Sequence, residues 1–350
     1  MENYEKLMKR CISLAKKGMG RTSPNPMVGC VVLNKSGQII SEGYHHKYGE
    51  NHAERDALLK LKNGEEKGGT LVVNLEPCSH YGKTPPCADL IIERGINKVI
   101  IGCKDNNPKV NGGGIKKLKS AGIEIVENVL KNECRKLNEV FFTNIEKKRP
   151  FIALKTATTI DGKISTSTGD SKWITSQKAR NFSKILRQKY DAILTSSNTI
   201  IADNPRMIHS KKIILDNNLR TDLTSDIYKN GEIFLVTSKK TNIDFPNVTV
   251  INPIIKDNNI DLNELMTKLY EHEIRSVFVE AGSVLSGSFI KNGLADKIYH
   301  FIAPKILNDN SGKSCFSGDN ISKVSESVIY KVDSVKRLSP DVLITYTNFL

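Results

Sequence analysis

Three side chains early in the sequence have the types and the spacing of a catalytic zinc site. His52 is followed by Cys78 and Cys87, which provides one imidazole and two thiolates. Zinc takes four tetrahedral ligands of this kind, and three protein ligands leave the fourth position for water. Glu54 stands two residues after His52, where its carboxylate can reach that water without binding the metal. We therefore predict a hydrolytic site in which Glu54 takes a proton from the water and delivers it to a leaving amine.

The residues around the second cysteine support its role as a ligand. Thr84 suits an N-cap, and Pro85 and Pro86 suit the first turn of a helix that would hold Cys87. Free N–H groups and the positive end of the helix dipole favour a thiolate there. The cysteines could instead be purely structural, or form a closed zinc site with His80 as the fourth ligand. The pattern of His-x-Glu followed by Pro-Cys and a second cysteine is typical of zinc deaminases and favours the catalytic interpretation.

Alternating strands and helices must position these side chains, and the first half of the sequence predicts them. The expected strands are residues 28–33, 70–75, 98–103 and 123–126, and the expected helices are residues 3–17, 52–61, 85–93, 114–120 and about 130–137. This alternation is typical of βαβ units, so we predict an α/β fold with a mainly parallel sheet flanked by helices. The candidate ligands then lie where strands end and helices begin, the usual place for a site in such a sheet.

A charged, proline-ended stretch at residues 144–150 predicts a linker, which separates a domain of residues 1–146 from one of residues 147–350. The second half also predicts an α/β fold, without an internal repeat of the first. Its expected strands are residues 151–154, 192–194, 212–215, 233–236, 248–251, 277–279 and 298–302, and its expected helices are residues 176–189, 262–271 and 283–292. No Gly-x-Gly-x-x-Gly follows its first strand, so the residues alone do not predict a Rossmann nucleotide site.

Composition limits the possible partners and compartment. Lysine and arginine number 52 against 38 acidic residues, a net charge of +14, but the basic residues are scattered and aromatic residues make up only 6%. We therefore expect no nucleic-acid partner. The first residues resemble no signal peptide, and no apolar run is long enough to span a membrane. Seven cysteines, an odd number, argue for a reducing compartment, and we expect a cytoplasmic protein. Whether it forms a homo-oligomer stays open.

The segment from Glu76 to Cys87 departs from the general zinc-deaminase pattern, because eight residues separate its two cysteines instead of two. Together with Asn-Pro-Met-Val-Gly at residues 25–29 and Asp-Asn-Asn-Pro-Lys-Val-Asn-Gly at residues 105–112, it closely resembles the bifunctional riboflavin-biosynthesis deaminase/reductase family. The resemblance implies a cytidine-deaminase-like N-terminal domain that hydrolyses an amine from 2,5-diamino-6-ribosylamino-4(3H)-pyrimidinone 5′-phosphate. By motif position it assigns substrate binding to Asn25, His45, Lys83 and Asn107.

The second half resembles the dihydrofolate-reductase-like α/β domain of the same family. The matching segments are residues 149–155, 161–163, 171–175 and 203–205. The resemblance implies that NADPH reduces the ribosyl group of 5-amino-6-(5-phosphoribosylamino)uracil to a ribityl chain, with Lys155 and Asp203 near the reacting carbon. It assigns substrate contacts to Ser171, Arg187, Met207, Ser210 and Glu280. It assigns the NADPH site to Ala157, Trp173, Thr199, Asp203, Gly282, Ser283, Val284, Leu285, Ser286, Gly287 and Ser288.

Several of these residues also have a structural interpretation. Trp173 could fill a core, Arg187 could lie on the surface, Lys83 could be a solvated loop lysine, and Asn25 between two prolines could set a turn. A second hypothesis for the whole chain is a nucleic-acid-directed zinc deaminase with a degenerate C-terminal binding domain. Only three aromatic residues, Tyr44, Tyr48 and Tyr81, lie near the zinc motif in sequence, which is thin support for base stacking.

One stretch of the second half departs from the family pattern. After residues 203–205 the family usually continues through a Leu-Thr-Val-Arg-like segment, whereas here the chain runs almost directly into the next strand, with Ser210 in place of the arginine. A phosphate-binding charge is therefore missing or is supplied by Arg206, His209 or Lys211. We expect reductase activity with weakened affinity for the substrate phosphate.

Overall fold

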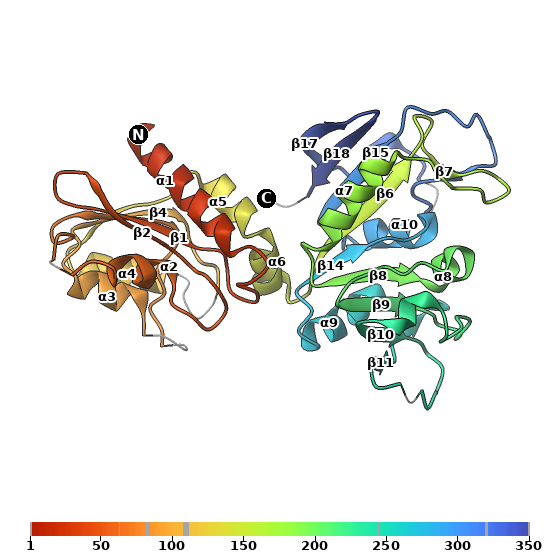
Figure 1. Cartoon of the computed structure of the whole chain (residues 1–350), viewed down its shortest axis with the longest axis horizontal. Coiled ribbons are helices and arrows are strands. Elements are labelled where there is room, and N and C mark those ends of the chain that lie inside the picture. Colours follow the sequence, from red (N-terminus) through yellow and green to blue (C-terminus); the bar gives the residue numbers. More distant parts are fainter. Residues whose placement is uncertain are drawn as a thin grey trace. The chain divides into compact units, whose positions relative to one another are not determined.

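The computed structural model describes residues 2–62, 64–81, 85–107, 112–243, 245–318 and 321–348. The chain divides between Lys147 and Lys148 into two compact units, each with its own sheet (Figure 1). Among the helices of the described residues, none combines the length and the apolar character that a membrane-spanning helix needs. The two units are described separately below.

The first unit is built on a five-stranded sheet of order β2-β1-β3-β4-β5. The strands are β1 (Gly29–Leu33), β2 (Ile39–Tyr44), β3 (Thr70–Leu75), β4 (Lys98–Cys103) and β5 (Glu124–Val126). β3, β4 and β5 are parallel, as expected, but β1 is antiparallel to both of its neighbours, so the sheet is mixed. β2 was not predicted, because it is a partly exposed edge strand with the polar residues Ser41 and Glu42 in its middle.

Helices cover both faces of this sheet (Figure 1). α1 (Glu2–Ala15) and α5 (Lys131–Leu137) lie on one face, and α2 (Ala53–Leu58), α3 (Cys87–Glu93) and α4 (Gly113–Ser120) lie on the other. Two strand glycines permit close packing: a Cβ on Gly29 would lie 2.1 Å from the carbonyl oxygen of Cys11 in α1, and one on Gly43 would lie 2.4 Å from that of Ala53 in α2. The segment after β3 lies beside the start of α3, where the N–H of Ala88 donates to the carbonyl oxygen of Cys78 over 3.1 Å.

The boundary between the units differs in detail from the predicted linker. The last helix of the first unit, α6 (Glu139–Lys147), continues through most of the charged stretch that was predicted as a linker. Elsewhere in this unit, a short 3₁₀ turn, η1 (Lys16–Gly18), follows α1. Phe142 of α6 is fully buried. Burial of the apolar side therefore stabilises α6, and its charged residues lie on the exposed side. The helix ends where Lys148 adopts a left-handed conformation with φ 52°, just before Pro150.

The second unit contains a nine-stranded sheet of order β11-β10-β9-β8-β14-β6-β15-β18-β17. Its parallel strands are β6 (Phe151–Thr158), β8 (Ala192–Ser196), β9 (Lys211–Leu215), β10 (Glu232–Val236), β11 (Val248–Ile251), β14 (Ser276–Val279) and β15 (Lys297–Ile302). The antiparallel strands β17 (Lys331–Leu338), at the edge of the sheet, and β18 (Asp341–Thr347), next to it, were not predicted. β17 is exposed along almost its whole length, so it has no alternating apolar pattern to reveal it.

Helices and two apolar clusters flank this sheet. The helices are α7 (Gln177–Arg187), α8 (Ser197–Asp203), α9 (Leu262–Glu271) and α10 (Ser283–Lys291), with short 3₁₀ turns η2 (Asp226–Lys229) and η3 (Val324–Glu326). Two small two-stranded sheets pair β7 (Lys163–Ser165) with β16 (Lys313–Ser314) and β12 (Ile255–Lys256) with β13 (Asn259–Ile260). One cluster joins α9 and Phe289 of α10 to the sheet, and the other joins Ile200 of α8 and Ile227 of η2 to it. Polar residues at or after the ends of the parallel strands, such as Ser196 and Glu280, line a cavity of this unit.

Candidate active sites

The three predicted zinc ligands come together in the first unit. His52 is the N-cap residue of α2, Cys78 follows β3, and Cys87 is the first residue of α3. Nδ1 of His52 lies 3.6 Å from Sγ of Cys78 and 3.5 Å from Sγ of Cys87, and all three ligand atoms lie within 4.8 Å of one another. Among the described residues, this group includes neither His80 nor Glu54. One nitrogen and two sulfurs around one point fit zinc with a free fourth position better than a closed structural site.

The surroundings of the two cysteines favour a thiolate. The backbone N–H of Cys87 donates to Sγ of Cys78 over 3.3 Å. Hydrogen bonding from the Cys87 thiol and from His52 lowers the pKa of Cys78 well below its usual value. Since zinc binds the thiolate form, the pair is prepared for a metal cation. The donor set and its charge therefore fit the metal that the sequence predicts.

Glu54 lies beside the ligand group without belonging to it. The residue is only 3% exposed in the first turn of α2, and this burial raises the pKa of its carboxyl to about 7. A carboxyl that is neither firmly charged nor firmly neutral near pH 7 suits a group that both accepts and donates a proton.

Two of the predicted substrate residues of the first unit lie next to the ligands. Nδ2 of Asn25 lies 3.2 Å from Nε2 of His45, and the rings of His45 and His52 stand edge to face with centroids 5.4 Å apart. Asn107 lies in the segment after β4, where its backbone N–H donates to the carboxylate of Asp105 over 2.8 Å. Lys83 lies outside the described residues. A hollow of about 450 Å³ in this unit is lined by residues close in sequence to His45 and His52, namely His46, Gly49, Glu50, Asn51 and Asp56.

Two buried polar residues that the sequence analysis did not single out hold these segments in place. Glu76, 4% exposed, accepts backbone N–H bonds from Asp105, Gly112 and Ile115 at 3.3, 3.2 and 3.1 Å. It thus fastens the segment after β4 and the start of α4 to the loop that carries Cys78. Asn74, fully buried in β3, accepts from the N–H of Gly29 over 2.7 Å and so fixes the segment after Asn25. The polar type of these residues, at or just past the end of a buried strand, was the available signal.

The second unit contains a cavity of about 1570 Å³ at the carboxyl ends of its parallel strands. A site for one drug-sized ligand usually measures roughly 300–1,000 Å³, so this cavity has room for a cofactor and a substrate together. Most residues that the resemblance assigned to the reductase site line it: Lys155, Ala157, Ser171, Trp173, Arg187, Thr199, Asp203, Met207, Glu280, Gly282, Ser283, Val284, Leu285 and Ser288. Ser210, Ser286 and Gly287 are not among the lining residues. Ser286 is 3% exposed, and Gly287 packs against the carbonyl oxygen of Ser317.

An ion group lies in the wall of this cavity. Arg187 of α7 and Glu280, which follows β14, form two parallel bonds, Nε to Oε1 at 2.6 Å and an amino nitrogen to Oε2 at 2.7 Å. Arg187 is therefore not a free surface arginine, and the Glu280 side chain is only 11% exposed. Burial lowers the pKa of Lys155, while Glu280 opposes the shift. For Glu280, burial would raise the pKa, but Arg187 and Lys155 together hold it below its usual value. The group keeps a carboxylate charged beside an amine that releases its proton more readily than an ordinary lysine.

The tryptophan is an exposed wall of the cavity, 62% accessible, and does not fill a core. The guanidinium of Arg180, a residue the sequence analysis did not single out, lies over its ring at 4.3 Å. Lys305 also donates to the carbonyl oxygen of Trp173 over 2.6 Å. Asp203, at the end of α8, pairs with Lys172 over 2.9 Å. Contacts with Arg180 and Lys305 thus hold Trp173 in the cavity wall, close in sequence to the ion pair of Lys172 with Asp203.

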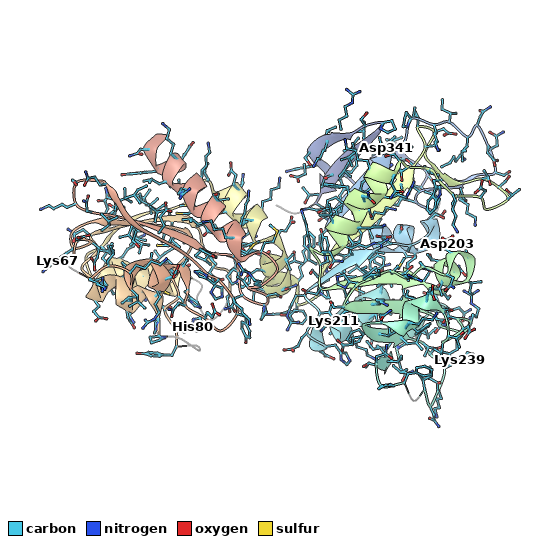
Figure 2. All side chains as sticks on the ribbon, viewed as in Figure 1. Lys67, His80, Asp203, Lys211, Lys239 and Asp341 are labelled. Carbon is cyan, nitrogen blue, oxygen red and sulfur yellow. The ribbon has the colours of Figure 1, made fainter. Side chains whose placement is uncertain are left out.

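The three residues that were considered as sources of a phosphate-binding charge, Arg206, His209 and Lys211, do not line the cavity. Arg206 pairs with Asp226 over 3.4 Å, and Lys211 lies 3.7 Å from Glu232. His209 is 9% exposed, and its ring nitrogens lie 3.0 Å from two backbone carbonyl oxygens. Figure 2 shows Lys211 and Asp203 at opposite ends of the strands of this unit. The prediction that one of Arg206, His209 or Lys211 replaces the arginine is therefore not supported by their positions.

Comparisons with known proteins agree for both units. The family model described as the RibD C-terminal domain matches residues 150–344, and that of the cytidine and deoxycytidylate deaminase zinc-binding region matches residues 1–103. The riboflavin biosynthesis protein RibD of Aquifex aeolicus is 42% identical, over 99% of this chain and 98% of its own length. That of Actinobacillus pleuropneumoniae is 40% identical, over 97% and 94%.

Solved structures give the same result over the whole chain. The diaminohydroxyphosphoribosylaminopyrimidine deaminase/5-amino-6-(5-phosphoribosylamino)uracil reductase of Thermotoga maritima is 41% identical and superposes with a TM-score of 0.86, covering 99% of both chains. RibD of Acinetobacter baumannii is 33% identical, with a TM-score of 0.87 and the same coverage. Both halves of this chain therefore have their counterpart in one relative.

Proposed function

Because the chain belongs to the RibD family of riboflavin biosynthesis proteins, we propose a residue assignment for its two reactions. The chain is a bifunctional enzyme, a zinc-dependent deaminase and an NADPH-dependent reductase. We assign the deaminase to residues 1–146 and the reductase to residues 147–350. The proposed substrates are 2,5-diamino-6-ribosylamino-4(3H)-pyrimidinone 5′-phosphate for the first step and 5-amino-6-(5-phosphoribosylamino)uracil for the second.

In the deaminase, His52, Cys78 and Cys87 hold the zinc ion. Zinc bound there supplies Lewis-acid activation of a water molecule. Glu54 takes a proton from the attacking water and delivers it to the exocyclic nitrogen of the pyrimidine. The carbon–nitrogen bond then breaks, ammonia leaves, and the ring carbon keeps the oxygen of the water. The observation that supports this most directly is the group of three ligand atoms within 4.8 Å of one another beside a buried glutamate.

Orientation of the pyrimidine is the role we assign to the amide and imidazole beside the zinc ligands. The Asn25 amide offers both a donor and an acceptor to a ring edge, and His45 is held by the carbonyl oxygen of Asn51 at 2.9 Å. Asn107 and Lys83 stay as proposed substrate residues on their motif positions, Lys83 as a point charge for the phosphate.

In the reductase, the cavity of the second unit holds both ligands. NADPH bound there would supply the hydride for reduction at C1′ of the ribosyl group in its ring-opened imine form. Lys155 holds a proton at Nζ and delivers it to the imine nitrogen, so that the carbon–nitrogen double bond becomes a single bond. Glu280 opposes the lowering of the Lys155 pKa that burial causes, and Arg187 holds Glu280 in place. We assign two further residues to the substrate-binding part of the cavity, Asp203 and Ser171. The NADPH-binding part is assigned to Ala157, Trp173, Thr199 and the start of α10.

We further propose that the enzyme works in the cytoplasm and without a nucleic-acid partner. All seven cysteines are free, and two of them are needed as thiolates, which supports a reducing compartment. The scattered charge supports a small anionic substrate more than a nucleic acid, and RNA binding that weakens steeply with salt would contradict this assignment.

A coupled assay tests the proposed function. The purified full-length chain is analysed for bound zinc, then mixed with the diaminopyrimidinone phosphate and NADPH, while ammonia release and NADPH consumption are followed. We expect one zinc ion per chain and NADPH consumption that begins after ammonia appears. Ammonia release without subsequent NADPH consumption would contradict the reductase assignment, and NADPH consumption before ammonia release would contradict the order of the steps.

A further inference from the structure

One face of α7 presents a row of basic side chains to the cavity of the second unit. Arg180, Lys184 and Arg187 all line the cavity, four and three residues apart on an eleven-residue helix. Residues at this spacing lie on the same side of an α-helix, one turn after another. The three cations therefore form one continuous strip along the wall.

Two of the three cations already have partners in the protein. Arg187 is bound in parallel to Glu280, and Arg180 donates to the side chain of Gln177 over 2.6 Å while its guanidinium covers the Trp173 ring. Lys184 lies between them and is exposed, and its side chain makes no hydrogen bond or ion pair in the described part of the chain. Its charge is therefore available to a ligand.

The charges around Lys184 favour an anion. The strip and Lys155 together have four positive charges, and Glu280 contributes the one carboxylate of this group. Lys172, the other lysine near the tryptophan, pairs with Asp203. The remaining lysines of the wall, Lys256, Lys291 and Lys313, come from other elements. A dianion placed against α7 thus finds two cations without a carboxylate partner in the described part of the chain, Arg180 and Lys184, and of these only Lys184 has no side-chain hydrogen bond there.

We infer that Lys184 binds the phosphate monoester of the reductase substrate. This inference rests on the proposed reductase function. The phosphates of NADPH are the other possible source of such an anion, but the residues proposed for NADPH include the start of α10, whereas Arg187 on the α7 strip is a proposed substrate residue. Lys184 is then a specificity residue for the phosphorylated substrate, and it takes no part in the transfer of hydride or proton.

The test compares Lys184→Gln with Lys178→Gln, a matched control on an exposed position of the same helix outside the cavity wall. The dissociation constant of 5-amino-6-(5-phosphoribosylamino)uracil is measured by calorimetry on the zinc-loaded full chain, together with KM, kcat and the KM for NADPH. Losing one charge-assisted bond predicts about a tenfold weaker affinity and a tenfold higher KM for this substrate, with kcat within about twofold. The KM for NADPH and the affinity for the dephosphorylated substrate stay unchanged, and Lys184→Arg restores most of the affinity.

An unchanged substrate affinity in Lys184→Gln would overturn the inference. A raised KM for NADPH alone would overturn it too, since the phosphate would then belong to the cofactor, and an equal loss for the dephosphorylated substrate would exclude phosphate recognition. A reductase kcat within about twofold of that of the unchanged chain shows that the second unit of the variant is folded. The calorimetric measurement separates failure of this inference from failure of the proposed function. A chain that binds the substrate but never consumes NADPH would contradict the reductase assignment. Its substrate affinity with and without Lys184→Gln would still test the phosphate contact.

Discussion

The two active sites of this chain are specified in different ways. The zinc ligands and Glu54 fall within residues 52–87, and each lies where a helix begins or a strand ends. The reductase residues range from Lys155 to Ser288, and the order of the parallel strands brings them together. A short segment with fixed spacing therefore defines the first site, whereas the topology of a whole sheet defines the second.

The sites also differ in how they are held together. The first has two cysteine sulfurs and an imidazole close to one another, an arrangement that a cation stabilises. The second is held by an ion pair of the protein itself, Arg187 with Glu280. The first site should thus depend on metal, and the second should form without it.

Removal of zinc is the strongest way to separate the two sites. We expect a chelator to abolish ammonia release and to leave NADPH consumption with the deaminated substrate unchanged, because the ligand group found among the described residues lies in the first unit. Both activities are measured on one preparation before and after dialysis and after zinc is restored. Parallel loss of both activities would contradict independent sites.

Substitution of the reductase lysine should give the opposite result. Lys155→Met removes the proposed proton donor, and a general acid commonly contributes about 10²- to 10⁴-fold to the rate. We expect a fall of about 10³-fold in reductase kcat and unchanged deaminase activity, with Lys240→Met on an exposed loop as the control. A loss of less than about tenfold would remove Lys155 from the catalytic step.

Glu76→Gln should have a moderate effect confined to the first site. The amide replaces one carboxylate oxygen by a donor that faces backbone N–H groups, so the bonds to Asp105 and Gly112 are lost. We expect about a tenfold rise in KM of the deaminase with zinc content and reductase activity unchanged, and no change in the exposed control Glu65→Gln. A lower melting temperature with normal KM would show a purely structural role.

The smallest expected effect is a shift in the pH profile of the reductase. Burial lowers the pKa of Lys155 from the ordinary value of 10.5. Because a proton donor must be protonated, kcat should decline on the alkaline side at a pH below 10.5, and the deaminase should not share this decline. Single-turnover rates over a pH series check this, and a decline only above 10.5 would argue against Lys155 as the donor.

The sequence predicted the zinc group and the parallel strands well, because both depend on local patterns. Buried runs such as residues 70–75 and 98–103 coincide with β3 and β4, but the helix predicted from residue 85 begins at Cys87, with Pro86 as its N-cap in place of the first turn. The predicted N-cap Thr84 lies outside the described residues. The orientation of β1 and the edge strands β2 and β17 could not be predicted, since strand direction and exposed pairing leave no apolar periodicity.

The reductase site shows why distributed sites need the fold. Lys155, Arg187 and Glu280 were assigned only through a resemblance, and nothing in their local sequence indicates the ion group they form. Arg180 and Lys184 were not singled out at all, because only the spacing on an observed helix places them beside Arg187 in the cavity wall.

One chain thus holds two independent sites, and Glu54 is the proton carrier of the first. The most direct measurement is zinc content, ammonia release and NADPH consumption in Glu54→Ala. We predict that ammonia release falls by at least about 10²-fold while zinc stays bound and the deaminated substrate is reduced at the normal rate. Loss of zinc, or a parallel loss of NADPH consumption, would contradict the account.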